Sequence, residues 1–248
     1  TLGVAFQALI LFLPLARIGF KYKPSFGLGG FGLRSMGPVA LGSLGVVITS
    51  EICGIILTRI ATSAPQRAHE LTGASLFSVA GNATYQNAYT LFILPYSLIA
   101  VSVSTAMFPK ISRSIAAANL DEARHDLVSA LNNVGLLIMF FAAAMVVFPE
   151  PIIRALLPSV SMDETMLISY ALIALSMGIP LGSAFLLIQR TFYAFEDGLH
   201  PFLSAVMQYG FTSIFMIIGM MVLPPEHWVL GIACSVTLGG LLAVSYTH

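Results

Sequence analysis

Glu51 is the ionisable side chain of this sequence whose position most needs an explanation. It lies thirteen residues into an apolar run from 38 to 58, which is long enough to cross a lipid bilayer. A charge at the centre of a bilayer costs about 2.5 to 3.5 kcal/mol on insertion scales, so such residues are candidates for functional sites by default. The depth of Glu51 makes it a candidate for coupling transport to a proton or cation. The alternative is a carboxyl group that is protonated, or paired with another helix, for structural reasons.

Three further polar residues accompany Glu51 along this run and just beyond it. At about 100° per residue, Thr58 and Thr62 point nearly the same way as Glu51, and Arg59 lies about 80° away at the outer end. A long arginine side chain at that place can reach the lipid headgroups. The spacing predicts a polar stripe with a cationic group beside its outer end.

A second polar stripe occupies the run from 86 to 108. Gln86, Thr90, Ser97 and Ser104 are spaced by 4, 7 and 7 residues, which places them within about 40° of one helix face. Asn87 is about 100° around from Gln86 and widens the polar face near the outer surface. Unsatisfied polar groups are costly in hydrocarbon, so this face must line a cavity or bond to a neighbouring helix. Both alternatives remain open, whereas the isolated Gln208 in a later run is interpreted as a structural group.

The elements that carry these stripes are predicted to be transmembrane helices. Of the 248 residues, 57% are apolar and 9% are charged, with a mean hydropathy of +0.91, which excludes a soluble globular domain. Eleven basic and eleven acidic residues cancel, so no overall field favours a nucleic acid. Seven apolar runs are long enough to span or nearly span a bilayer: 1–16, 38–58, 86–108, 131–149, 166–188, 202–223 and 227–247.

The loops between these runs predict an orientation. The odd-numbered connections hold eight basic residues and the even-numbered ones hold three. By the positive-inside rule, the odd connections are cytoplasmic and the chain starts outside. The sequence begins within an apolar run and ends without a polar tail, so we expect an internal piece of a longer membrane protein.

Local signals predict where two helices begin. Asn119 with Glu122, and Ser161 with Glu164, have the spacing of capping boxes that open the fourth and fifth helices.

Other local signals predict bends and close contacts. Pro95 and Pro180 lie inside runs, where each removes a backbone donor and favours a kink. Gly231, Ser235 and Gly239 form a small-residue ridge typical of a close helix contact.

The sequence offers no catalytic constellation. None of the five histidines lies within an apolar run or forms a paired metal-ligand spacing, and no serine or cysteine has a recognisable histidine or carboxylate partner nearby. We therefore expect a protein that is not an enzyme and binds no cofactor or metal, with coupling to the membrane potential or a monovalent cation as an open option.

Several segments resemble the MurJ/MviN family of lipid II flippases. They occur in the family's order and cover most of the chain: 87–95, 104–112, Leu2-Gly3 with Gln7 and Pro14, Pro38, and 190–194 followed by Asp197 and Pro201. The resemblance implies an all-α, fourteen-helix, two-lobed transporter of the multidrug/oligosaccharidyl-lipid/polysaccharide class in the bacterial cytoplasmic membrane. Residues 1–16 are then the last helix of the N-lobe, 17–37 a cytoplasmic linker between lobes, and 38–248 a truncated C-lobe.

The resemblance also implies a substrate and roles for the polar residues. The substrate is a polyprenyl-pyrophosphate-linked glycopeptide lipid, flipped by alternating access among membrane lipids, with cell-wall synthesis proteins as candidate partners and no nucleic acid. Gln86, Asn87, Thr90, Ser97 and Arg59 are expected in the substrate cavity. Thr90 stands where the family commonly has an arginine, whose fork suits a pyrophosphate. The alternatives are a related exporter of another polyprenyl-linked glycan or a drug, and a membrane scaffold that does not transport.

Overall fold

The computed structural model describes Phe6, Ile10 and residues 33–246. The chain divides into two compact units, Thr1–Met36 and Gly37–His248, and the architecture below is that of the second. The predicted run 1–16 and the linker residues 17–32 lie outside the described residues, apart from Phe6 and Ile10.

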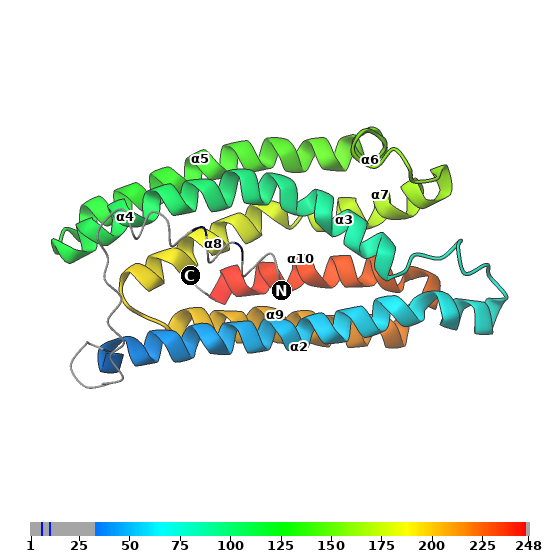
Figure 1. Cartoon of the computed structure of the whole chain (residues 1–248), viewed down its shortest axis with the longest axis horizontal. Helices are drawn as coiled ribbons and strands as arrows, with labels where there is room; N and C mark the ends of the chain where they lie inside the picture. Colours follow the sequence, from blue (N-terminus) through cyan, green and yellow to red (C-terminus); the bar gives the residue numbers. More distant parts are fainter. Residues whose placement is uncertain (1–5, 7–9, 11–32, 247–248) are drawn as a thin grey trace. The chain divides into compact units, whose positions relative to one another are not determined.

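The described part of the chain is helical and contains no strand (Figure 1). Its elements are α2 (Leu33–Thr72), α3 (Asn82–Pro95), the π-helix η1 (Tyr96–Val101), α4 (Ser102–Ala116), α5 (Leu120–Val147), α6 (Pro149–Leu156), α7 (Met162–Ser176), α8 (Ile179–Ala194), α9 (Leu199–Val222), the 3₁₀-helix η2 (Pro225–His227) and α10 (Trp228–Tyr246).

Five of the seven predicted spans are confirmed as helices long and apolar enough to cross a membrane. The pair α7 and α8 makes a sixth if the two bent helices count as one span. The helices extend beyond the apolar runs: α2 has 40 residues, or about 60 Å, whereas the hydrocarbon layer is about 30 Å thick. The ends of α2 therefore project past the hydrocarbon, and its last turns carry the ion pair between Arg67 and Glu70 at 3.0 Å.

Both predicted helix starts are confirmed. The side chain of Asn119 accepts a hydrogen bond from the backbone N–H of Glu122 at 3.3 Å, directly before α5. Ser161 and Glu164 form the full reciprocal capping box before α7. These side chains satisfy backbone donors that have no partner within the first helical turn.

The two prolines change the helices in different ways. Pro95 ends α3 and is followed at once by the π-helical turn η1, because proline cannot donate to the carbonyl four residues earlier. Pro180 lies in the first turn of α8, where a missing N–H costs nothing. The predicted kink at Pro180 is confirmed as a break between α7 and α8 with a bend of 44°.

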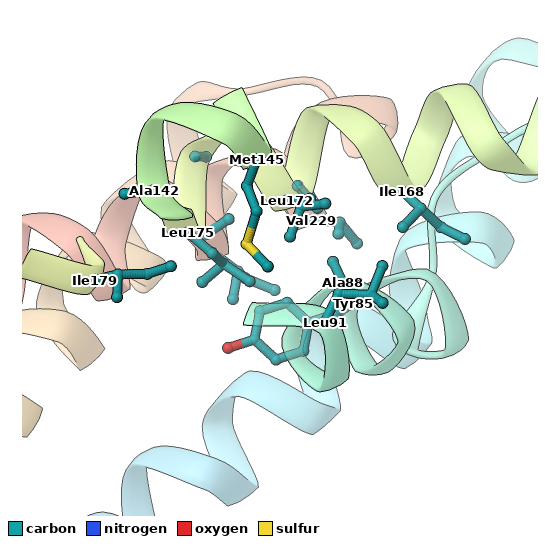
Figure 2. Close-up of a cluster of buried hydrophobic side chains, with 14 of the residues drawn as sticks. Tyr85, Ala88, Leu91, Ala142, Met145, Ile168, Leu172, Leu175, Ile179 and Val229 are labelled. Carbon is teal, nitrogen blue, oxygen red and sulfur yellow. The ribbon is translucent and has the colours of Figure 1, made fainter. Parts of the chain in front are cut away.

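An apolar core lies where α3, α5, α7, the start of α8 and α10 meet (Figure 2). Leu91, Leu172, Leu175 and Val229 in this core are at most 1% exposed. Alanines such as Ala88 fill the remaining positions, which lets the helix backbones approach closely, as is usual between membrane helices. We call this cluster the apolar core.

Helix α9 packs closely along α10, and α2 approaches the start of α9 at one glycine. A Cβ added at Gly239 of α10 would lie 1.9 Å from the Thr212 hydroxyl, which confirms the close contact predicted for the small-residue ridge. On the other side, a Cβ added at Gly42 of α2 would lie 2.1 Å from the Gly198 carbonyl oxygen at the start of α9. Only glycine therefore permits these helices to approach as they do.

Asp197 caps the start of α9. Its carboxylate accepts hydrogen bonds from the backbone N–H groups of Leu199 at 2.9 Å and His200 at 3.2 Å, and it pairs with the His200 ring. Burial acts to raise the pKa of Asp197, but the bonds from His200 and Leu199 and the charge of His200 outweigh it and lower the pKa below the ordinary value of an aspartate. Asp197 thus stays ionised at the positive end of α9, where an anion is stabilising.

Candidate functional site

A cavity of about 550 Å³ opens between α2, α3, η1, α8 and α9. Its wall carries a carboxylate from α2, the amide Gln86 from α3, Gln189 from α8 and Gln208 from α9. Four tyrosines line it as well: Tyr85, Tyr89, Tyr96 and Tyr209. We call it the tyrosine cavity.

The tyrosines of α3 and η1 form a ladder of stacked rings. Successive ring centroids of Tyr85, Tyr89, Phe92 and Tyr96 are 6.0, 5.5 and 6.4 Å apart, and neighbouring rings lie within 29° of parallel. All four rings line the tyrosine cavity. The ladder connects the tyrosine cavity with the apolar core, because Tyr85 is 4% exposed and belongs to both.

The predicted stripe on α2 forms one continuous, shallow and open depression on the surface of this single helix, which we call the hollow. Glu51, Thr58, Arg59 and Thr62 line it together, as their spacing predicts. This hollow shares Glu51, Thr58 and Gly54 with the tyrosine cavity, so Glu51 stands at the border of both. Arg59 lines the hollow and is not part of the cavity wall.

The predicted stripe on the third run is only partly one face. Gln86 lines the tyrosine cavity, whereas Thr90 and Ser97 are exposed and donate to carbonyls of their own helix at 2.8 and 3.1 Å. Asn87 is half-buried.

The prediction is wrong for Ser104, which is 1% exposed inside the protein. The reason is η1, because a π-helix turns less per residue than the 100° assumed for the whole run. Residues after η1 therefore face a different direction from those before it.

Sequence reasoning missed part of the cavity wall. Gln189 is assigned to a connection by the sequence, but α8 continues to Ala194 and holds it in the wall, and Gln208 is a wall residue rather than an isolated structural group. The signal for the ladder was present, because Tyr85, Tyr89 and Tyr96 repeat at spacings of 4 and 7. Those spacings match a core face as well as a cavity face, so periodicity alone did not distinguish them.

Charge is distributed unevenly over the site. The cavity wall contains one carboxylate, Glu51, and none of the described residues that line it is a lysine or arginine. No cluster of three or more His, Cys, Asp or Glu side chains suited to a metal occurs among residues 33–246. The polar groups of the cavity are therefore mainly uncharged amides and phenols.

A family model described as "Lipid II flippase MurJ" matches residues 1–247 of the chain. The chain belongs to the MurJ family. Two curated relatives agree with this assignment. The "Lipid II flippase MurJ" of Thermosipho africanus (strain TCF52B) is 27% identical over 167 residues, which cover 65% of this chain and 32% of the relative. The "Probable lipid II flippase MurJ" of Rhizobium meliloti (strain 1021) is 29% identical over 120 residues, which cover 46% and 22%.

Solved structures show the same fold. A lipid II flippase MurJ in an inward closed conformation superposes with a TM-score of 0.67 at 22% identity, covering 96% of this chain and 47% of that one. A MOP superfamily transporter from Pyrococcus furiosus superposes with a TM-score of 0.63 at 15% identity, covering 91% of this chain and 46% of that one.

The fold is therefore that of a MOP-type transporter, and the chain spans about a third or less of the length of the curated MurJ relatives it matches. Membership of the MurJ family and the apolar helices make it a multi-pass protein of the bacterial cytoplasmic membrane.

Proposed function

We propose that this chain forms most of the C-lobe of a flippase that moves lipid II across the cytoplasmic membrane by alternating access. In this proposal 1–16 is the last helix of the N-lobe, 17–37 the linker and 38–248 the C-lobe. The protein transports without catalysing a covalent reaction, and membrane lipids and cell-wall synthesis proteins are its surroundings and candidate partners.

The observation that carries the proposal is a polar, open cavity within an otherwise apolar bundle. Its wall combines Glu51 from α2, Gln86 from α3 and Gln208 from α9, three helices that each also present apolar faces. Polar groups inside a membrane are costly and are kept where they line a substrate or ion path. The family membership supports lipid II as the substrate.

We further propose roles for the polar residues of α2, α3 and η1. Arg59 offers bidentate donors to a pyrophosphate, and the exposed Thr90, with Gln86, Asn87 and Ser97, contacts the headgroup. Glu51, at the border of the hollow and the tyrosine cavity, couples the cycle to the membrane potential or a monovalent cation.

The proposal is tested by lipid II translocation in vesicles that contain the full-length protein. Glu51→Gln, Arg59→Gln and Thr90→Val should each slow the appearance of lipid II at the outer face, with the largest loss for Arg59→Gln. Glu70→Gln and Arg67→Gln are matched controls, because these residues pair with each other on the exposed end of α2. Unchanged translocation in the three cavity variants would remove their roles. No translocation by the unaltered protein would favour a scaffold or another substrate.

A further inference from the structure

The tyrosine cavity presents an unusual set of unpaired groups. Gln86, Gln189 and Gln208 line the cavity, and none of their side-chain amides bonds to another described residue, unlike the hydroxyls of Ser204, Thr212 and Ser213 on α9. The same is true of the hydroxyls of the four tyrosines. Each amide offers two donors and an acceptor oxygen, and each phenol offers both functions. The wall is therefore rich in hydrogen-bonding capacity that the described residues do not use among themselves.

These groups limit what can occupy the cavity. A hydrocarbon chain that displaced water from the wall would leave several donors and acceptors unpaired, which is costly. A pyrophosphate or a peptide carboxylate would find no lysine or arginine among the described residues of the wall, and these are the side chains that pair best with such anions. The occupant that remains is uncharged and carries many hydroxyl or amide groups.

The aromatic ladder specifies this occupant further. The rings of Tyr89, Phe92 and Tyr96 stand next to the amides in the same wall. Sugar rings carry apolar C–H groups beside their hydroxyls, so they can pack against aromatic side chains while their hydroxyls bond to neighbouring amides. The cavity volume of about 550 Å³ falls in the range of about 300 to 1,000 Å³ that is usual for small-molecule sites.

We infer that the tyrosine cavity is a glycan subsite, which holds the uncharged sugar portion of the lipid-linked headgroup while the pyrophosphate stays outside it. This inference rests on the proposed function. Arg59 lies in the adjoining hollow, outside the cavity wall, where it can reach a pyrophosphate without bringing that group into the cavity. The sugars of the headgroup thus lie in the tyrosine cavity and its pyrophosphate lies beside Arg59, with Glu51 at the border between the two places.

The experiment measures the affinity of the full-length purified protein for three ligands that share one polyprenyl chain. They are lipid II, the same lipid with its sugars but without its peptide, and the polyprenyl pyrophosphate without sugars. Gln208→Leu and Tyr89→Phe each remove hydrogen-bonding capacity from the wall and largely keep its shape. Asn133→Leu and Tyr170→Phe are matched controls on exposed faces of α5 and α7.

The two cavity variants should each weaken binding of both sugar-bearing lipids by about fivefold to tenfold, the usual effect of one lost hydrogen bond. Binding of the polyprenyl pyrophosphate should not change, and the controls should leave all three affinities unchanged. Equal weakening for all three ligands, or no weakening for the sugar-bearing ones, would overturn the inference. Weakening that requires the peptide would assign the cavity to the peptide and overturn it as well.

Failure of the proposed function has a different signature. If the two variants lose sugar-dependent affinity but the unaltered protein does not translocate lipid II, the glycan subsite is supported and the flippase function is refuted. If the unaltered protein translocates lipid II and the two variants show no sugar-dependent loss of affinity, the flippase function is supported and the glycan subsite is refuted.

Discussion

Helix α3 contributes side chains to both the apolar core and the tyrosine cavity, and the two regions differ in how completely side chains fill them. On α3, Ala88 and Leu91 face the core and are at most 1% exposed, whereas Tyr89 and Phe92 face the cavity and are partly exposed. The core side is filled completely by side chains and needs no ligand. The cavity side leaves space and unpaired polar groups. One helix of mixed apolar and polar residues therefore supplies both a packing surface and a binding surface.

The contacts of the apolar core hold the protein together, whereas the polar groups of the tyrosine cavity are free for function. In the core, stability depends on volume, because each side chain has neighbours on all sides and a vacancy is not refilled. In the cavity, a polar side chain exchanges water for ligand and contributes little to folding. The two regions should therefore respond differently to similar substitutions.

The largest expected effect is the loss of a core side chain. Leu172→Ala removes a leucine that is 0% exposed, and it should lower the free energy of unfolding by about 2 to 5 kcal/mol. Denaturant titration of the full-length protein in detergent measures this. Leu136→Ala is the control, because Leu136 is 76% exposed and should change the value by less than about 0.5 kcal/mol. Equal losses at both positions would contradict the assignment of the core.

A smaller effect is expected where α10 supports the cavity helix α9. The Cβ of Gly239→Ala would lie 1.9 Å from the Thr212 hydroxyl and 2.9 Å from the Gln208 carbonyl oxygen, so the helices must separate at a cost of about 1 to 3 kcal/mol. Thermal unfolding compares this variant with Gly240→Ala, whose new Cβ would meet nothing within 4 Å. Similar melting temperatures for the two variants would show that the close contact is not required.

The smallest effect on stability is expected inside the tyrosine cavity. Gln208→Leu replaces an amide that has no partner in the described chain, so the free energy of unfolding should change by less than about 0.5 kcal/mol. The same titration used for Leu172→Ala measures it. A loss as large as that of Leu172→Ala would make Gln208 a structural residue, and the contrast between core and cavity would disappear.

Much of the helical organisation was predictable, because it depends on local composition. Five apolar runs, or six with the bent pair α7 and α8 counted as one, became helices long enough to span a membrane, and the caps at Asn119 and Ser161 formed as predicted. Hydrophobicity over about 20 residues and a capping side chain three residues from its partner are properties of a short stretch of chain. The family resemblance was also visible in short segments and was confirmed over residues 1–247.

The candidate site was predictable only where its residues share one regular helix. Glu51, Thr58, Arg59 and Thr62 came together because α2 is regular throughout this stretch. Ser104 did not join Gln86, because η1 changes the helical phase between them. No period in the sequence reveals a π-helical turn, although a proline such as Pro95 marks the place where one can form.

The amino-acid sequence is enough to show that the chain crosses a membrane, where two of its helices begin, and which of its few charges must be explained. The packing of the helices is needed to show which polar residues share the cavity wall, because Gln86, Gln189 and Gln208 come from helices far apart in the chain. It also decided that the tyrosines of α3 and η1 line a cavity rather than a packed interface. Periodicity defines the face of a helix, but what that face contacts depends on the close approach of other helices, which glycines such as Gly42 and Gly239 permit.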